Sequence, residues 1–329
     1  PLIRPYYLIV LSGMLPVCIF NVLAQWSFGC NDTALPTWIV LAANAVNIFG
    51  NYLLIYGNWG MPELGLTGAG ISTLTARFIC MGAILWVFFG TWRGAPYIAG
   101  FRAKADKSDG MFRRVAATGF PVSMQMTFET ASFSGSAIMA GWIGAVSLAA
   151  FQIVAISGMI GFCIYYSIGA AMAIPLSQAA GTGDRAAMRR TAWGGYHLIL
   201  ATMVLVSALF ALGGSHIMGL FSSDPAVIGL AVTLIVPLVL YQFGDATQIS
   251  FANALRGTSH VMSMMWIAFV SYLMVNIPSG YLLGFPLGLG ITGIFIAFSL
   301  GLFVAASLFY FYFRRVLHRN LLPSGSQSA

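Results

Sequence analysis

The sequence has very few charged residues. Of its 329 residues, 7% are charged and 59% are hydrophobic, whereas a soluble globular domain has about 25% charged residues. A chain of this length with so few polar side chains cannot cover the surface of a water-soluble fold. The composition therefore predicts a protein whose main solvent is lipid.

Several chemical signatures are also missing. The four cysteines show no CxxC spacing and fall mostly in apolar runs, which predicts small hydrophobic side chains and neither a disulfide nor a metal site. No P-loop, nucleophile elbow or His/Glu spacing of zinc proteases occurs. We therefore expect no ATP-driven transport, no enzyme activity and no cofactor. The chain begins at Pro1 without a basic leader segment, and we expect that its N-terminal part is missing.

Long apolar runs are what the sequence does contain. About 20 apolar residues are needed to cross a hydrocarbon core of about 30 Å. Nine runs are this long, near residues 6–28, 37–56, 66–91, 115–139, 144–175, 192–212, 227–252, 262–283 and 290–313. Turn residues such as Gly181-Thr182-Gly183-Asp184 separate them. The predicted fold class is all-α, a polytopic membrane helix bundle.

The basic residues predict the orientation of the chain in the membrane. Thirteen of the 15 Lys and Arg residues fall in loops of one parity, at 92–114, 185–190, Arg256 and 314–319. Lys and Arg are enriched in cytoplasmic loops. We therefore predict a multi-pass protein of the plasma (inner) membrane whose C-terminus is cytoplasmic.

An internal repeat predicts two lobes. Residues 47–54 (Asn-Ile-Phe-Gly-Asn-Tyr-Leu-Leu) resemble 276–283 (Asn-Ile-Pro-Ser-Gly-Tyr-Leu-Leu), and Gly65-Leu66-Thr67-Gly68 recurs as Gly290-Ile291-Thr292-Gly293. The copies lie six spans apart and so cross the membrane in the same direction, which predicts pseudo-symmetric lobes related by an axis near the membrane normal. The predicted parts are a first-lobe remnant of three spans (1–91), a cytoplasmic linker (92–114), a six-span lobe (115–319) and a polar tail (320–329).

Two acidic residues lie inside predicted spans. Six of the eight acids are in loops, but Glu129 and Asp245 are not, and an ionised carboxylate at a helix centre costs about 2.5–3.5 kcal/mol. Either the carboxyls hold protons or a cation, such as a sodium ion, lies between them. Both alternatives describe an ion-coupling site. The structural alternative is a buried base or a helix break, although no Lys or Arg lies within reach in either helix.

Polar and aromatic residues share the helix faces of these two acids. Three- and four-residue spacings place Gln125 and Phe133 with Glu129, and Tyr241 and Gln248 with Asp245. A ring beside a carboxylate attracts organic cations, while ordinary packing is the alternative for any single Phe. These faces are predicted to point into the lobe.

Other polar residues in the spans have open interpretations. Asn47 and Asn51 either line a cavity or hydrogen-bond between helices. Arg77 either snorkels, pairs with an acid or acts directly. His197 and His216 lie near span ends, where wetted surface histidines are expected.

Short motifs along nearly the whole chain resemble the multidrug and toxic compound extrusion (MATE) family. Those in the first half are Tyr56-Gly57, Met61-Pro62-Glu63-Leu64-Gly65 and Gly68-Ala69-Gly70. Those in the second half include Gly119-Phe120-Pro121, Leu148-Ala149-Ala150-Phe151-Gln152, Tyr241-Gln242-Phe243-Gly244-Asp245, Leu255-Arg256-Gly257 and Ile277-Pro278-Ser279-Gly280-Tyr281. Their number and order make the resemblance specific.

The resemblance implies a two-lobe antiporter of twelve helices that exports cationic or aromatic compounds against sodium ions or protons. By position, Glu129 and Asp245 match the carboxylates that the family uses for cation coupling, with Tyr241 beside them. Phe133 and Phe162 match aromatic positions of the drug cavity, and Asn47 and Asn51 match polar positions of the first lobe. We count Gln125 and Gln248 with the substrate-binding residues. A working monomer is expected.

Two other functions compete with this one. A flippase for lipid-linked sugars or peptidoglycan precursors has similar lobes but needs a basic cavity for pyrophosphate, whereas the predicted cavity residues are acidic and aromatic. An intramembrane enzyme would use Glu129 and Asp245 as an acid/base pair, but no nucleophile or metal partner is evident. The antiporter is the leading hypothesis.

Overall fold

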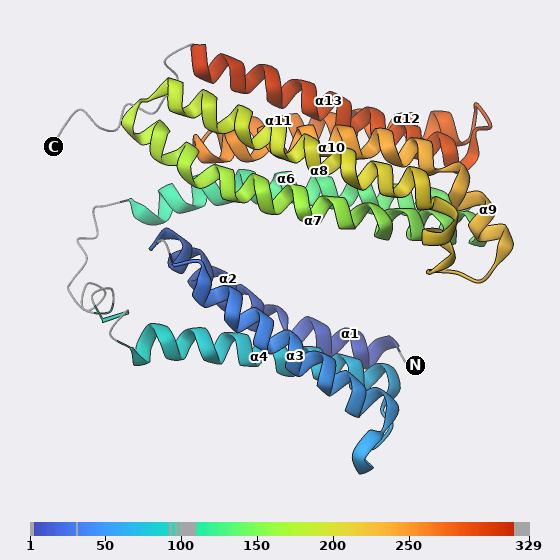
Figure 1. Cartoon of the computed structure of the whole chain (residues 1–329), viewed down its shortest axis with the longest axis horizontal. Helices are drawn as coiled ribbons and strands as arrows, with labels where there is room; N and C mark the ends of the chain where they lie inside the picture. The colour runs from blue at the N-terminus through green and yellow to red at the C-terminus, as the bar shows by residue number, and fades with distance from the viewer. Residues whose placement is uncertain (1–2, 31, 92–93, 96–97, 99–109, 319–329) are drawn as a thin grey trace. The chain divides into compact units, whose positions relative to one another are not determined.

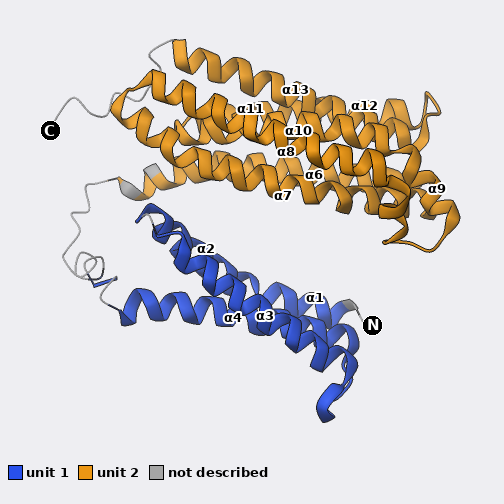
Figure 2. Ribbon diagram, in the orientation of Figure 1, with its two compact units in different colours: residues 1–109 blue, residues 110–329 orange. Residues whose placement is uncertain are grey.

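The structure is a computed structural model that describes residues 3–30, 32–91, 94–95, 98 and 110–318, and every regular element in these residues is helical (Figure 1). The chain divides into two compact units, residues 1–109 and 110–329 (Figure 2). Most of the predicted linker 92–114 and the predicted tail 320–329 lie outside the described residues.

Unit 1 contains the three predicted spans of the first lobe. Its helices are α1 (Ile3–Ser12), α2 (Met14–Gly29), α3 (Ala34–Tyr56), a short 3-10 helix (Asn58–Gly60) and α4 (Gly65–Gly90). Helix α4 packs against α1, α2 and α3. The predicted run 6–28 is therefore two helices, which break at Gly13.

The guanidinium of Arg77, a charge inside a predicted span, lies at the break between α1 and α2. The Arg77 side chain on α4 is half-buried and donates a hydrogen bond of 2.9 Å from Nη1 to the backbone oxygen of Val10, at the end of α1. A Cβ at Gly13 would lie 2.6 Å from this nitrogen, so a larger residue would require the Arg77 side chain to shift. Arg77 therefore satisfies a carbonyl at a helix break, which is a different role from each of those left open by the sequence.

Unit 2 contains the remaining helices. They are α6 (Met111–Ile143), α7 (Ala145–Thr182), α8 (Arg185–Gly219), α9 (Pro225–Thr233), α10 (Ile235–Gly257), α11 (Val261–Ala268), the π-helical segment η2 (Phe269–Asn276), α12 (Ile277–Gly284) and α13 (Gly290–His318). Helix α10 packs against α7, α8 and α13. A Cβ at Gly244 on α10 would lie 3.0 Å from the Cβ of Leu302 on α13, so glycine allows this close approach.

The turns between helices form as their residues predict. Gly57 and Gly183 follow α3 and α7 in the left-handed conformation, with φ of +66° and +73°, which favours glycine. Asp184 and Asp224 cap α8 and α9 by accepting hydrogen bonds of 2.9 Å from backbone nitrogens two or three residues later. The residues at these four positions therefore determine where the helices end and begin.

The predicted run 227–252 is not one straight helix. It forms α9 and α10, which are bent by 50° at Leu234. Pro237 has no backbone N–H to donate to the carbonyl of Thr233, four residues earlier, so the α-helical ladder is interrupted here. The bend places Asp245 on the helix that follows the break.

Fewer helices pass a hydropathy test for spans than the nine predicted. Seven described helices are long and apolar enough to cross a membrane, or eight if the bent pair α9 and α10 counts as one span. Helix α6, which contains the predicted run 115–139, is not among them. Its 33 residues would reach about 50 Å at about 1.5 Å each, but hydroxyl and amide side chains and Glu129 lower its hydropathy.

The outer surface of unit 2 is apolar. Large side chains such as Leu205, Leu212 and Val236 are 72%, 90% and 70% exposed. In water such a surface would drive association, whereas lipid is as apolar as leucine. The exposed side chains are therefore consistent with a membrane-embedded helix bundle.

The internal repeat has the same backbone geometry in both units. The backbone nitrogen of Leu64 donates to the oxygen of Leu54 at 2.9 Å, and that of Leu289 donates to the oxygen of Leu283 at 3.2 Å. A Cβ at Gly68 would collide with the Leu54 carbonyl, and one at Gly293 with the Leu283 carbonyl. The α3–α4 and α12–α13 hairpins are therefore built in the same way, as the matching sequences predict.

Candidate functional site

The two buried acids lie on different helices of unit 2 and interact. Asp245 on α10 is 2% exposed, and Glu129 on α6 is half-buried. The two carboxyls are close enough for their charges to repel each other. Because both acids belong to unit 2, their proximity does not depend on the first lobe.

Three tyrosines surround the acids. Tyr241 on α10 and Tyr272 on η2 are within electrostatic range of both carboxyls, and Tyr165 on α7 is within range of Asp245. Tyr165 and Tyr272 are fully buried. We call Glu129, Asp245, Tyr165, Tyr241 and Tyr272 the carboxylate cluster. Four helical elements contribute to it, so a shift of any one of them changes its geometry.

Several buried polar atoms around the cluster have no hydrogen-bond partner among the described residues. They include Oδ2 of Asp245, Oε1 and Nε2 of Gln242, Oε1 of Gln125 and Oε1 of Gln248. An unpaired buried polar group costs about 1–3 kcal/mol, and clustered oxygen atoms are ligands that hard cations such as sodium or magnesium prefer. The donor set therefore suits an alkali cation or ordered water.

Two glycines on α7 make room for the polar side chains. A Cβ at Gly161 would lie 2.8 Å from the hydroxyl of Tyr165 and 2.9 Å from Nε2 of Gln242, and one at Gly158 would lie 3.2 Å from the ring of Tyr241. The side chains of α10 therefore lie directly against the α7 backbone. Any larger residue at these positions would displace the groups next to Asp245.

Aromatic rings cover one side of the cluster. Tyr241 stacks on Phe298 at 5.4 Å between ring centroids, and Phe133 lies 6.1 Å from Phe298 and 5.5 Å from Phe151. Phe133 remains 36% exposed, so part of its ring is free to contact a ligand. The structure thus joins Phe133 and Tyr241 through one ring, Phe298, which the sequence interpretation did not include.

Phe162 lies in a second aromatic group on α7. Its ring stacks on Tyr166 at 5.6 Å and packs against the buried cluster that contains Tyr165. Tyr165 therefore connects this group to Asp245. Phe162 and Phe133 approach the acids from different helices.

A basic residue does lie within range of the acids, contrary to the sequence interpretation. Arg256, on the same helix as Asp245, interacts electrostatically with Glu129. Its Nη1 donates to the hydroxyl of Tyr166 at 3.4 Å and to Oδ1 of Asn253 at 3.3 Å. Since these are neutral acceptors, Arg256 offsets part of the charge of Glu129 without forming an ion pair with it.

The π-helical segment is connected to the helix of Glu129. The amide nitrogen of Asn276 donates to Ser132 on α6, a buried hydrogen bond, and the ring of Phe269 lies 5.5 Å from Phe128. Short π-helical segments often occur at functional sites. Here the segment supplies Tyr272 to the carboxylate cluster.

Asn47 and Asn51 lie in unit 1 and bond to each other and to α4. Asn47 donates to Ser72 at 3.2 Å and to Thr73 at 3.5 Å, and Asn51 donates to Asn47 at 3.3 Å. Asn47 therefore links two helices, which is the structural alternative that the sequence left open. The Oδ1 atom of Asn51 is buried without a partner among the described residues.

The remaining polar candidates do not join the site. His197 is exposed and its ring contacts the backbone oxygen of Trp193 at 2.7 Å, and His216 is exposed near the end of α8. Among the described residues, no group of three or more His, Cys, Asp or Glu side chains could hold a metal ion.

Sequence reasoning missed Tyr165, Tyr272, Gln242 and Arg256. Gln242 lies three residues before Asp245 and so shares its helix face, which was a usable signal. Tyr165 and Tyr272 are on other helices, and nothing local marks their orientation. Arg256 lies eleven residues after Asp245 on α10, too far along the sequence for spacing to indicate contact.

Comparison with known proteins gives a consistent result. The MatE family model matches residues 121–282. The probable multidrug resistance protein NorM of Geobacillus kaustophilus is 29% identical over 316 residues, which cover 96% of this chain and 69% of that protein. The protein of the same name from Bradyrhizobium diazoefficiens is 32% identical over 317 residues, covering 93% of this chain and 66% of that protein.

Other relatives are matched over a smaller part of their length. The chain spans 58% of a Xanthomonas axonopodis NorM and 57% of one from Xylella fastidiosa. Each of these is described as a probable multidrug resistance protein.

Solved structures share the fold. A MATE crystal structure in the bent conformation has a TM-score of 0.78 at 19% identity, covering 95% of this chain and 68% of that one. The eukaryotic MATE transporter AtDTX14 has a TM-score of 0.75 at 16% identity, covering 97% of this chain and 78% of that one.

Proposed function

Because this chain belongs to the MATE family of multidrug efflux transporters, we propose that it exports amphipathic cationic or aromatic compounds in exchange for sodium ions or protons. The observation that carries the proposal is the carboxylate cluster of unit 2. Its two acids come from two helices, repel each other, and are surrounded by unpaired polar atoms. The relatives are transporters, so an intramembrane enzyme is not supported.

The coupling cation binds between Glu129 and Asp245. Two ionised carboxylates in a desolvated site are unfavourable because each costs about 2.5–3.5 kcal/mol and each repels the other. A proton or a sodium ion removes part of both penalties. The oxygens of Gln242, Gln125 and Gln248 are available as further ligands, and Tyr241 lies beside both acids.

The substrate and the coupling cation compete for the same charge. A cationic drug gains from the negative charge of the cluster and from the exposed face of Phe133. Once a proton or sodium ion neutralises the acids, that attraction falls. The effect is reciprocal, and couplings of about 1–3 kcal/mol, or about 5–150-fold in affinity, are typical. Binding of the cation therefore favours release of the drug.

Further proposed substrate-binding residues of unit 2 lie beside the carboxylate cluster and in the second aromatic group on α7. Phe133 and Phe162 supply rings, and Gln125 and Gln248 supply amides. In unit 1, Asn47 and Asn51 are proposed to bind substrate, and the Oδ1 of Asn51 has no partner among the described residues. The protein acts as a monomer in the inner membrane, with its C-terminus in the cytoplasm, because the basic loops share one side.

The experiment is gradient-driven transport in vesicles. The protein is reconstituted, a sodium or pH gradient is imposed, and uptake of a fluorescent organic cation is followed. Glu129→Gln and Asp245→Asn should each lose gradient-driven transport yet keep dye binding. Glu63→Gln and Asp224→Asn are matched controls, since both acids are exposed and asparagine also caps helices. Normal transport by Glu129→Gln would refute the proposal.

The response to voltage reports the net charge moved in each exchange, and the separate ion gradients identify the cation. Exchange of one sodium ion for one monovalent drug moves no net charge, so the membrane potential has no effect on the drug gradient. Exchange of two protons for that drug moves one charge, worth about 2.3 kcal/mol or about 50-fold per 100 mV. Collapsing the sodium gradient, the pH gradient and the potential separately distinguishes these cases.

A flippase for lipid-linked precursors is the competing function. Its substrate is anionic, and the acids of the carboxylate cluster would repel a pyrophosphate. Dye accumulation and lipid flipping measured in the same vesicles decide between the two functions.

A further inference from the structure

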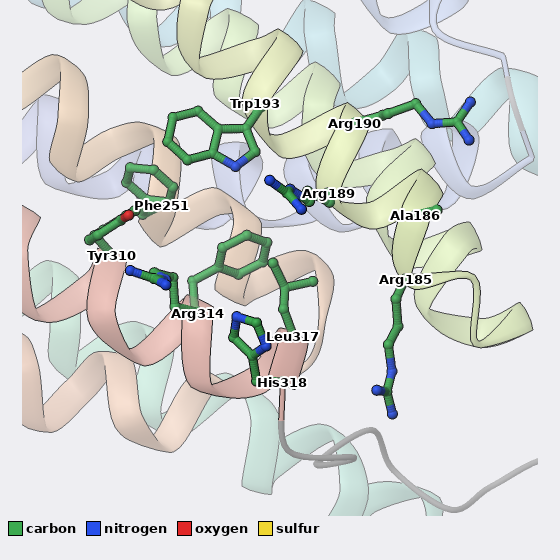
Figure 3. Close-up of a pocket in the computed structure, with 11 residues that line it drawn as sticks. Arg185, Ala186, Arg189, Arg190, Trp193, Phe251, Tyr310, Arg314, Leu317 and His318 are labelled. Atoms are coloured by element: carbon green, nitrogen blue, oxygen red, sulfur yellow. The ribbon is translucent and has the colours of Figure 1, made fainter.

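A basic pocket lies at one end of unit 2, away from the carboxylate cluster. It has a volume of about 740 Å³ and lies between the start of α8 and the end of α13 (Figure 3). Its cationic side chains are Arg185, Arg189 and Arg190 of α8, and Arg314 and the titratable His318 of α13. None of the cluster residues lines it.

Among the described residues, the arginines of this pocket have no acidic partner. Within the part of the chain that the structure describes, no carboxylate forms an ion pair with Arg185, Arg189, Arg190 or Arg314. Asp184, the nearest acid in sequence, caps α8 by accepting from the backbone nitrogen of Ala187. Four like charges around one cavity repel one another, and an anion in the cavity would relieve that repulsion.

The floor of the pocket is aromatic and well packed. Trp193 and Phe251 lie 6.3 Å and 5.1 Å from the ring of Tyr310. The guanidinium of Arg314 lies over the same Tyr310 ring at 5.9 Å, a cation–π contact. Figure 3 shows Arg189 and Arg314 on opposite walls, with the rings of Trp193 and Tyr310 beside them. The rings thus hold one arginine in place.

An apolar groove continues from this floor. It has a volume of about 260 Å³ and shares Trp193, Phe251 and Tyr310 with the basic pocket. Its other walls are Tyr196 of α8, Phe243 and Thr247 of α10, and Phe303, Ala306 and Ser307 of α13. The charged cavity and the apolar groove are therefore adjacent, with three aromatic side chains in common, and together present a polar end and an apolar end.

The predicted spans put the site at the expected level of the lipid head groups. The predicted span 192–212 begins beside it and the predicted span 290–313 ends beside it, so we expect the arginines just outside the hydrocarbon core and the groove inside it. Trp and Tyr are enriched at this level. The groove runs along α8, α10 and α13, whereas Glu129 and Tyr165 lie on α6 and α7.

We propose that this site binds an anionic glycerophospholipid, with its phosphodiester head group among the arginines and an acyl chain in the aromatic groove. Basic pockets between membrane helices on the cytoplasmic side suit such head groups. A cavity of about 740 Å³ falls within the range of about 300–1,000 Å³ found for small-molecule sites. The proposal depends on membrane embedding and is independent of the transport cycle.

The test uses tryptophan quenching by brominated lipid. The purified protein in neutral detergent is titrated with phosphatidylglycerol or phosphatidylcholine that carries bromine on one acyl chain. Phosphatidylglycerol should quench at lower concentration, and this selective part should disappear in Trp193→Phe, because Trp193 lines both the pocket and the groove. Equal quenching by both lipids, or selective quenching that survives in Trp193→Phe, would overturn the proposal.

Matched variants test each end of the site. An arginine near an anionic lipid surface contributes about 1 kcal/mol, so Arg189→Gln and Arg314→Gln should each weaken phosphatidylglycerol binding about fivefold. Arg315→Gln should not, because Arg315 is exposed beside Arg314 but does not line the pocket. If Arg314→Gln and Arg315→Gln behave alike, the arginines do not bind the lipid.

The groove has its own control. Ser307→Phe fills the groove and should weaken lipid binding, whereas Leu308→Phe, one residue later and outside the groove, should not.

Competition experiments test other ligands. If glycerophosphoglycerol, the head group alone, competes as well as the whole lipid, the site holds a soluble anion. Displacement of the lipid by a poly-glutamate peptide at low concentration would instead identify an acidic protein partner. Either result rejects the lipid.

Discussion

Replacing Gly293 with alanine should destabilise unit 2, and replacing Gly68 should destabilise unit 1 in the same way. A Cβ at Gly293 would lie 2.6 Å from the oxygen of Leu283, and one at Gly68 would lie 2.7 Å from the carbonyl carbon of Leu54. Contacts of a Cβ atom under 3.0 Å essentially never occur, so the helices must separate by at least about 0.4 Å at Gly293 and by more at Gly68, where the oxygen of Leu54 is nearer still. Both obstacles are backbone atoms, which cannot rotate away.

The size of the effect follows from two opposing contributions. Overpacking costs about 1–3 kcal/mol, while alanine is better than glycine in a helix by about 1 kcal/mol. A Cβ added at Gly82 on α4 or at Gly194 on α8 would meet no atom within 4 Å, so Gly82→Ala and Gly194→Ala should gain only the second contribution. The difference between a variant and its control therefore isolates a clash of about 1–3 kcal/mol.

Thermal unfolding in detergent, followed by circular dichroism, measures this difference. For domains of 150–250 residues about 1 kcal/mol shifts Tm by about 2–4 °C, so Gly293→Ala and Gly68→Ala should unfold about 2–12 °C below their controls. Their effects should add in the double variant, since the two glycines lie in separate units. If Gly293→Ala unfolds at the temperature of Gly194→Ala, the proposed equivalence of the two hairpins is wrong.

Three further predictions test other parts of the structure. Asn276→Ala leaves the buried hydroxyl of Ser132 without its donor and should cost about 1–3 kcal/mol, read from thermal unfolding, whereas an unchanged Tm would exclude that hydrogen bond. Arg77→Met should cost about 1.5–3 kcal/mol, because a charged hydrogen bond to Val10 is lost, while the exposed Arg4→Met serves as control and should leave Tm unchanged. Pro237→Ala restores a backbone donor and should reduce the 50° bend between α9 and α10, measured by the distance between spin labels on the two helices; an unchanged distance would show that tertiary packing sets the bend.

Hairpins and their turns could be predicted from the sequence because their signals are local. An apolar run with a glycine at the left-handed position identifies the ends of α3 and α7, and a capping aspartate identifies the starts of α8 and α9. The interruptions inside the spans could not be predicted in the same way. The break at Gly13 lies against Arg77, which is distant in the sequence and donates to Val10 there, and the π-helical segment Phe269–Asn276 has no distinctive composition. Such features depend on tertiary contacts.

The acids of the site were predictable and their surroundings were not. Glu129 and Asp245 are conspicuous because a charge in an apolar helix has a known cost. Tyr165 and Tyr272 are not, since tyrosine is common in membrane helices and only helix packing decides which ring meets an acid. Arg256 could not be assigned to the site from the sequence either. It interacts electrostatically with Glu129, but its spacing from the acids along the sequence does not indicate this.

The unpaired atoms around Asp245 argue against a purely structural role for the acids. A structural carboxylate is normally satisfied by hydrogen bonds, since each buried polar group without a partner costs about 1–3 kcal/mol. Asp245 and Gln242 together leave three such atoms unpaired among the described residues, and hydrophobic side chains of similar volume would avoid this cost. Stability alone would therefore disfavour this arrangement. A ligand that binds and leaves, as a coupling cation does, accounts for oxygens that the protein itself leaves unpaired.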